Sequence, residues 1–474
     1  MKKMKSIGSW LVPAVAALCL LMTGCVSRRI AWSPDGAHAA VFAGDGLHLC
    51  GPDGALSETI LPGNGLAEWF SDSRRLAVMS EVGNQSWKDL QKVISPEERE
   101  RVMQGGKTVL DEFKAGHSLA DALKALTGLG DYERNAVAVY LAESEGTKEQ
   151  AGTNWDALQQ IEASVLQIRI GTLEEGKLAL GPPLINSLRK ILDIRVSPTG
   201  TAIACTAEGD IKDELQLLAV PTDGSAPPQL VARNTAYCSD WSVDGHSLVY
   251  VHAINECANS DQLSIGSLTR RGILNTAGKI EIQTNADDLA GLLFDANNKV
   301  RCLSDGRIIF AAADLHLPCT SLDMPQQPQL FALDPEREAA AIPLIPRAMQ
   351  DSLPGKTDFY ETSPDGKRIA ISGEKGTVVV LTLATGKLDT VQAAGQEATV
   401  SVPGKNSESL SQYKVEATAK EETVSVPAWR SSSELCYVFT PKGQPAQVAL
   451  WNNGTNRLLS ANWPPEARKG FLDK

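Results

Sequence analysis

Short apolar runs alternate with polar turns along most of the chain, and one phrase returns at intervals. It reads IAWSPDGAHAAVF at residues 30–42 and YETSPDGKRIAIS at residues 360–372. Each copy contains an apolar or aromatic anchor, a tight polar turn, and then a β-branched, apolar run of the kind that strands prefer. A recurring unit of this size indicates a repeat architecture.

The copies can be aligned by their anchors, two of them nearly complete and five degenerate. Each unit predicts strand, turn, strand, loop, strand, turn and strand, which is a four-stranded antiparallel sheet. A lone sheet cannot bury both faces, whereas radial stacking buries them and leaves only short edges. We therefore predict an all-β fold, a β-propeller of six or seven blades. The anchors are Trp32, Trp69, Val196, Trp241, Cys302, Thr362 and Trp429.

The residue types of the repeat indicate packing and turn formation. Pro34 presets φ at a turn position, Asp35 can bond the turn backbone, and Gly36 tolerates positive φ. We expect the aromatic anchors to pack in the core between blades. We expect the turn aspartates to act as structural caps.

A helical period interrupts the repeat between residues 87 and 166. The letters SPEE at residues 95–98 predict a capping box with proline at the first helical position, and apolar residues follow at helical spacing. We predict that residues 87–166 form a helical insertion in the second blade. Because propeller function is often carried by such loops, the insertion is the first candidate for a partner surface. A cap packed on the propeller is the alternative.

The sequence predicts no catalytic residue, metal or cofactor. The letters GHSLA at residues 116–120 faintly resemble a hydrolase nucleophile elbow, which needs a strand before the serine. A predicted helix precedes this segment instead, and Ser118 is better explained as an N-cap with Asp121 at the third position. The six histidines show no metal-ligand spacing, and the sequence has neither a CxxC pair nor a glycine-rich phosphate loop after a strand.

The repeat resembles the Ser-Pro-Asp-Gly repeats of TolB-type propellers, which are relatives of the WD-repeat folds. The best matches are WSPDG at 32–36, WSVDG at 241–245 and SPDG at 363–366, and the resemblance covers most of residues 30–459 outside the insertion. Members of this family serve as protein-binding platforms, peptidase gating domains and sugar lyases, so the resemblance implies a fold and no single function. Two departures from the family bear on this resemblance. The first repeat begins almost at the expected processed terminus, where TolB has a separate domain, and we expect no hydrolase domain like that of the peptidase relatives after Trp429.

The first residues resemble a bacterial lipoprotein signal. Three lysines within residues 2–5 precede an apolar stretch at 7–21 that is too short for a stable membrane span. The letters LMTGC at residues 21–25 resemble a lipobox, whose cysteine is acylated and becomes the new N-terminus. Met22 is a mild departure from the usual leucine, and an ordinary secretory signal is the alternative.

This second resemblance predicts the processing and the location of the protein. Residues 1–24 would be a lipoprotein signal peptide, Cys25 would be lipidated, and residues 25–474 would form the propeller with its insertion. Because no aspartate follows the cysteine, the sorting rule of such lipoproteins implies the outer membrane, and we expect the protein to face the periplasm.

The overall charge narrows the range of partners. The chain has a net charge of −12, and residues 1–24 contribute three lysines and no acid, so the processed chain would be more acidic still. An acidic protein is poorly suited to nucleic acid or to electrostatic binding of anionic lipid. Membrane attachment would therefore depend on the acyl chains at Cys25.

Nine cysteines are present, and the periplasm permits disulfides. Cys238 with Cys257, and Cys302 with Cys319, flank equivalent hairpins, and we predict a bridge within each pair. Three others lie in strand-like runs, where buried apolar roles are expected; they are Cys50, Cys205 and Cys436.

A polar segment at residues 396–425 predicts a loop or a short extra hairpin on the last blades. Taken together, the patterns predict an outer-membrane lipoprotein without catalytic activity. It would bind an envelope protein or a peptidoglycan-associated partner through its propeller and insertion. A glycan-binding, lyase or hydrolase propeller that uses the central pocket is the alternative; clustered His, Arg, Tyr and acidic side chains in the channel would favour it.

Overall fold

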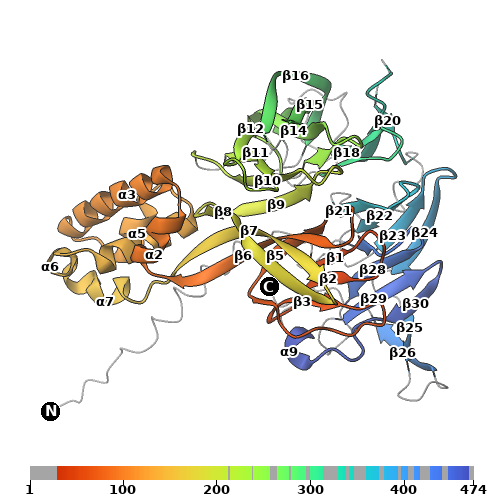
Figure 1. Cartoon of the computed structure of the whole chain (residues 1–474), viewed down its shortest axis with the longest axis horizontal. Helices are drawn as coiled ribbons and strands as arrows, with labels where there is room; N and C mark the ends of the chain where they lie inside the picture. Colours follow the sequence, from red (N-terminus) through yellow and green to blue (C-terminus); the bar gives the residue numbers. More distant parts are fainter. Residues whose placement is uncertain are drawn as a thin grey trace, which may run out of the picture.

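The protein is described by a computed structural model, in which seven antiparallel sheets surround a central channel as the blades of a propeller (Figure 1). The predicted β-propeller is thereby confirmed, with seven blades. The described residues are 29–211, 214–237, 239–256, 264–276, 279–294, 299–312, 329–337, 341–345, 359–372, 378–392, 397–403, 410–416, 427–439 and 447–468.

Each blade takes four strands that follow one another in the sequence. The first four blades are β1 (Ile30–Trp32), β2 (Ala39–Phe42), β3 (Gly46–Cys50) and β4 (Leu61–Pro62); β5 (Gly65–Trp69), β6 (Arg75–Gln85), β7 (Ala163–Glu174) and β8 (Lys177–Ser187); β9 (Ile191–Val196), β10 (Ala202–Glu208), β11 (Leu215–Pro221) and β12 (Gln229–Arg233); and β13 (Asp240–Trp241), β14 (Ser247–Glu256), β15 (Ser264–Thr276) and β16 (Lys279–Phe294).

The last three blades follow the same order, and the seventh carries an extra hairpin at its outer edge. The strands are β17 (Val300–Cys302), β18 (Ile308–Ala312), β19 (Gln329–Leu333) and β20 (Ile342–Pro343); β21 (Phe359–Thr362), β22 (Arg368–Ser372), β23 (Val378–Thr382) and β24 (Lys387–Gln392); and β27 (Ala428–Trp429), β28 (Glu434–Phe439), β29 (Gln447–Asn452) and β30 (Thr455–Leu458), with the hairpin β25 (Glu397–Pro403) and β26 (Leu410–Glu416) beside β30. The hairpin predicted for the polar segment is thus present.

The repeated turn is held by its own serine and aspartate. Ser33 Oγ donates to Asp35 Oδ1 at 2.6 Å, and the same carboxylate oxygen accepts the backbone N–H of Ala37 at 3.0 Å. Gly36 adopts φ 67°, a left-handed conformation that glycine takes without steric cost. The equivalent bonds recur at Ser242 and Ser363. The aspartates are therefore caps of the turn, as the sequence predicts.

Each predicted anchor is the last residue of the innermost strand of its blade. Trp69, Trp241 and Trp429 are almost fully buried. Each donates its indole Nε1–H to a backbone carbonyl of the preceding blade, at 2.9 to 3.0 Å. These three anchors therefore join neighbouring blades by a hydrogen bond as well as by packing.

The helices lie between β6 and β7, in the second blade, and extend away from the ring at the left of Figure 1. We call residues 87–158 the helical module. Its elements are α2 (Trp87–Val93), α3 (Pro96–Lys114), α4 (Leu119–Lys124), α5 (Asp131–Glu143), α6 (Thr147–Ala151), η1 (Gly152–Asn154) and α7 (Trp155–Leu158). The predicted capping box is formed, since Ser95 accepts from Glu98 N and the Glu98 carboxylate accepts from Ser95 N. Ser118 caps α4 by accepting from Asp121 N, as predicted.

The module has a hydrophobic core of its own, built from apolar residues of its helices together with the start of β7. Helices α3 and α5 cross closely because two glycines of α3 face α5. A Cβ on Gly105 would lie 2.8 Å from Val137, and a Cβ on Gly106 would lie 2.7 Å from Tyr140.

Polar contacts fix the module against the neighbouring blades. Glu98 is 6% exposed and accepts the backbone N–H of Leu188, just before the third blade, at 2.9 Å. Arg101 pairs with Glu133 inside the module at 3.0 Å and with Asp210 of the third blade at 3.3 Å. The module is therefore a fixed projection of the propeller.

The ring closes between the first and the seventh blade without exchanging a strand. A core cluster unites β1–β3 with β28, β29 and the segment that ends in α9 (Pro465–Arg468). Trp463 Nε1 donates to Gly54 O at 2.8 Å, Arg430 Nε donates to Gly36 O at 3.1 Å, and the Arg430 guanidinium lies 5.2 Å from the ring centre of Trp32. We call this junction the seam.

The cysteines depart in part from expectation. The structure has Cys302 as a free thiol, so the predicted bridge between Cys302 and Cys319 is wrong. Cys319, and both Cys238 and Cys257 of the other proposed bridge, lie outside the described residues. The remaining described cysteines are buried free thiols in strands, as predicted; they are Cys50, Cys205 and Cys436.

Candidate functional site

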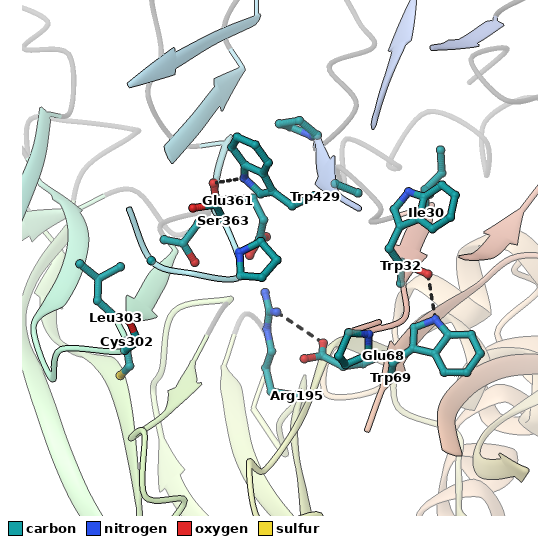
Figure 2. A pocket seen from close by; sticks show the side chains of 18 of the residues that line it. Ile30, Trp32, Glu68, Trp69, Arg195, Cys302, Leu303, Glu361, Ser363 and Trp429 are labelled. Carbon is teal, nitrogen blue, oxygen red and sulfur yellow. Dashed lines mark hydrogen bonds and ion pairs between the residues drawn. The ribbon is translucent and has the colours of Figure 1, made fainter. Parts of the chain in front are cut away.

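A cavity of about 410 Å³ lies at the centre of the ring. The innermost strands supply its walls, so side chains from all seven blades meet there (Figure 2). One lining residue from each blade in turn is Trp32, Glu68, Arg195, Val243, Cys302, Glu361 and Trp429.

The turns of the repeated phrase surround this end of the channel. Pro34, Ser304 and Pro364 line the cavity from the turns that follow the innermost strands. In an antiparallel blade, the turn after the first strand and the connection between the second and third strands lie at opposite ends. The helical module connects β6 to β7, so it projects from the face opposite to these turns.

The residue immediately before each anchor forms a ring of alternating charge. From the first blade to the seventh these residues are Ala31, Glu68, Arg195, Asp240, Arg301, Glu361 and Ala428. Acidic and basic side chains thus alternate from the second blade to the sixth, and alanines stand on the two sides of the seam. Opposite charges in neighbouring blades attract one another.

Three contacts show how the charged ring joins the blades. Arg301 donates to both carboxylate oxygens of Glu361, at 3.0 and 3.1 Å, a bidentate arrangement that fixes orientation. Arg195 lies 3.4 Å from Glu68 in the preceding blade, and Figure 2 shows it between Glu68 and Glu361. Asp240 accepts the backbone N–H of Cys302, in the following blade, at 2.9 Å.

Arg195 has the most strongly charged surroundings of the channel. It is 6% exposed, and its Nε lies 3.4 Å from the carboxylate of Asp193 on its own strand. Burial alone lowers the pKa of Arg195, but nearby carboxylates, Glu68 foremost, outweigh it and raise the pKa well above its ordinary value. The guanidinium is therefore a permanent positive charge in the channel wall.

Asp240 is the channel group whose charge changes near neutral pH. Burial raises the pKa of Asp240 to about 7, although Arg195 and the backbone N–H of Cys302 oppose this shift. The repulsion from Glu68 and Glu361 acts in the same direction as burial.

The arrangement binds the blades together and offers little for covalent chemistry. Arg301 and Glu361 hold each other, and Arg195 is surrounded by acids. Burial raises the pKa of the Cys302 thiol well above its ordinary value, so the thiolate that would act as a nucleophile is disfavoured. Among the described residues that line this cavity there is neither histidine nor tyrosine.

The charged ring was missed by the sequence reasoning, although a signal was present. A charged residue stands directly before the anchor in five copies of the repeat, within strands that are otherwise apolar. The one predicted site residue, the lipidation site Cys25, lies outside the described residues, together with the predicted signal peptide.

Within the described ranges, no group of three or more His, Cys, Asp or Glu side chains is arranged to hold a metal ion. Nor does any described helix have the length and apolar character needed to cross a membrane.

No protein-family model matches the chain, and no curated protein matches its sequence. Solved propeller structures resemble it at low identity. The β-propeller domain of Myceliophteria thermophila Cps50 (Swd1) is 10% identical over 90% of this chain and 96% of that one, with a TM-score of 0.44. Putative TolB from Agrobacterium tumefaciens is 12% identical over 60% of this chain and 84% of that one, with a TM-score of 0.35.

A peptidase is also among the similar structures. The puromycin-hydrolyzing peptidase of Mycobacterium tuberculosis is 14% identical over 62% of this chain, with a TM-score of 0.39, and the chain spans 43% of its length. Likeness at this level concerns the fold alone. The chain is thus a seven-bladed β-propeller whose fold is similar to TolB-like and peptidase propeller domains.

Proposed function

We propose that the protein is a lipoprotein of the outer membrane, anchored through Cys25, which serves as a scaffold for another envelope protein or a peptidoglycan-associated partner. The lipobox-like letters at residues 21–25 support the anchor. The first strand begins at Ile30, so the propeller would lie close to the membrane surface.

The helical module is the observation that carries the scaffold proposal. It has its own core, and Glu98 and Arg101 fix it to the neighbouring blades. A rigid projection loses little conformational entropy when it binds, which favours its use as a docking surface. Met103 on α3 is 43% exposed and offers an adaptable apolar contact at that surface.

The central channel favours a scaffold over a catalytic propeller. Its acids and arginines hold neighbouring blades together, and a lyase or hydrolase would need such groups to be available to substrate. The cavity is therefore assigned a structural role in the proposal.

The partner is tested by crosslinking the full-length lipoprotein in its native envelope and co-purifying what is bound. In a second sample, residues 86–162 are replaced by a two-residue Asn-Gly turn, which suits the adjacent ends of β6 and β7, where Gln85 lies opposite Ala163. A third sample carries Met103→Glu and Lys107→Glu on the exposed side of α3. The control is Ile342→Glu, at an apolar position of the fifth blade that is 66% exposed.

We expect one crosslinked partner with the native chain and the control, and its loss from both module variants. Retention of the partner by both module variants would move the interface away from the module. Absence of any crosslinked partner from the native chain would contradict the scaffold proposal.

The anchor is tested separately with Cys25→Ala. We expect this variant to lose acylation of its N-terminal peptide, measured by mass spectrometry, and to leave the membrane fraction. Membrane retention of the unacylated variant would contradict an anchor at Cys25.

A further inference from the structure

A second cavity lies between the third and fourth blades, and none of the described innermost strands lines it. Its volume is about 530 Å³, and its walls are β12 of the third blade and β14–β16 of the fourth. The polar side chains that line it include Tyr250, His252, Thr269, Arg271 and Asp288. We refer to it as the side pocket.

Tyr250 is the most unusual residue of the side pocket. Only 2% of it is exposed, and it packs in the apolar core between the two blades. Among the described residues its hydroxyl makes no hydrogen bond, and it borders the pocket. The hydroxyl is thus open to the pocket, where a ligand can accept a hydrogen bond from it in place of water.

The seventh blade shows how the same position is satisfied elsewhere. Trp241 pairs with Leu248, and Tyr250 follows two residues later; Trp429 pairs with Leu435, and Tyr437 follows two residues later. Tyr437 is equally buried, but its hydroxyl donates to Asn456 Oδ1 on the outer strand at 3.0 Å. In the fourth blade the corresponding space is the side pocket.

Arg271 supplies the positive charge of the pocket. Its Nη1 donates to the carbonyl of Val231 at 2.6 Å, which fixes the guanidinium against the third blade, while its buried Nε has no hydrogen-bond partner. Arg233 also lines the pocket but pairs with Asp210 and Glu214. Arg271 is therefore the guanidinium left to bind an anion.

Asp288 lines the same pocket and supplies a hydrogen-bond acceptor. Its Oδ1 accepts from Ser267 at 3.1 Å and from Thr269 at 3.0 Å, and its Oδ2 makes no hydrogen bond with the described residues. Tyr250, Arg271 and Asp288 line the same pocket, so one small ligand can contact all three. Burial raises the pKa of Tyr250, so its hydroxyl stays protonated and can donate.

We propose that the side pocket binds a small molecule in which a carboxylate lies next to a hydroxyl or ammonium group. The carboxylate would accept from Arg271 and from the Tyr250 hydroxyl, and the hydroxyl or ammonium would donate to Asp288 Oδ2. The volume lies within the range of small-ligand pockets, about 300–1,000 Å³. A sugar acid carries a carboxylate next to hydroxyl groups, and a dipeptide carries a carboxylate and an ammonium group separated by one peptide unit. The proposal is independent of the scaffold function.

The test is isothermal titration calorimetry of the full-length protein in detergent with two carboxylate probes, D-glucuronate and L-alanyl-L-alanine. Their counterparts without a carboxylate are D-glucose and L-alanyl-L-alanine amide. We expect one carboxylate probe to bind with a Kd below about 1 mM, and at least about ten-fold more tightly than its counterpart, since a charged pair contributes several times RT. The probe that binds identifies the source of the ligand.

Two variants locate the binding. Tyr250→Phe removes a hydroxyl that no described residue uses, so we expect an unchanged Tm and a Kd about 3- to 10-fold weaker. Arg271→Gln should weaken binding more strongly. Tyr437→Phe is the matched control and should leave the Kd unchanged.

Failure of both carboxylate probes to bind below about 10 mM would overturn the proposal, since that affinity is too weak for a built site. Equal binding of a probe and its counterpart without a carboxylate would overturn it as well. So would a Kd that Tyr250→Phe leaves unchanged.

Discussion

At the scale of single residues, the innermost strand of each blade uses its two faces differently. The anchor points to the preceding blade, as Trp241 does when it donates to Arg195 O. The residue before the anchor points to the following blade, as Asp240 does when it accepts from Cys302 N. Because successive strand residues point to opposite faces, two adjacent positions can join three blades.

The indole hydrogen bond can be tested by comparing two anchors. Trp241→Phe leaves the buried carbonyl of Arg195 without its donor, and we expect a loss of about 1–3 kcal/mol in the free energy of unfolding. Trp32→Phe removes the same atoms, but Trp32 Nε1 lies beside the sulfur of Cys436, a weak acceptor, and makes no hydrogen bond of normal geometry. Urea unfolding should therefore show the smaller loss for Trp32→Phe, and equal losses would contradict this role of the indole.

The charge of Asp240 predicts a dependence of stability on pH. Its pKa is about 7 in the folded protein and about 3.9 in an unfolded chain. Its contribution to stability is therefore full below about pH 4 and is lost as the pH rises through about 7. Asp240→Asn has no titrating group at this position and does not lose this stability as the pH rises. The free energy of unfolding of the variant, measured relative to that of the native protein, should therefore increase from pH 5 to pH 8.

The turn residue Asp244 provides the control for this measurement. The hydrogen bond from Ser242 lowers the pKa of Asp244 below its ordinary value. The contribution of Asp244 to stability is therefore full when the pH is above the ordinary pKa, and it is lost only as the pH falls through the lowered pKa. Asp244→Asn should therefore shift stability by the same amount at pH 5 and pH 8. A difference between native protein and Asp240→Asn that does not change with pH would contradict the assigned titration.

At the scale of elements, the helical module depends on the close crossing of α3 and α5. Two glycines allow this approach, and helix propensity alone would disfavour them by about 1 kcal/mol each. The module therefore gives up local helix stability for tertiary packing around Val137 and Tyr140.

Gly106→Leu should separate these helices. A Cβ alone would come within 2.7 Å of Tyr140, so the larger side chain must displace α5. We expect a loss of about 1–3 kcal/mol, typical of overpacking, and faster amide exchange in α3 and α5 while the blades stay protected. Gln104→Leu, an exposed position of the same helix, should not show this exchange, and slow exchange in Gly106→Leu would contradict the close packing.

At the scale of the whole molecule, the ring depends on a seam formed from apolar side chains and from the polar contacts of Trp463 and Arg430. This residue is 2% exposed and lies in the cluster shared by the first and seventh blades. We expect Trp463→Ala to cost about 3–5 kcal/mol and to raise amide exchange first in β1–β3 and β28–β29. Trp87→Ala, in the core of the module, should instead raise exchange in the helices, and a uniform response in both variants would contradict a separate seam.

Much of this architecture follows from the repeated phrase. The anchors end the innermost strands, the turn aspartates are caps, and Ser95 and Ser118 start helices, because each of these signals is local. The charged ring and the side pocket depend on which strands become neighbours after closure. No single copy of the repeat contains the partner of Arg301 or the space beside Tyr250.

The seam also determines which part of the propeller can fold last. Its hydrogen bonds join Arg430 to Gly36, 394 positions apart, and Trp463 to Gly54, 409 positions apart. Six blades can be assembled from neighbours in the sequence, but the first blade must wait with one face uncovered until the last is made. Contacts between residues so far apart in the sequence form slowly. The newly synthesised chain therefore passes through an incomplete ring, and its two uncovered end blades are sites for chaperone binding or aggregation.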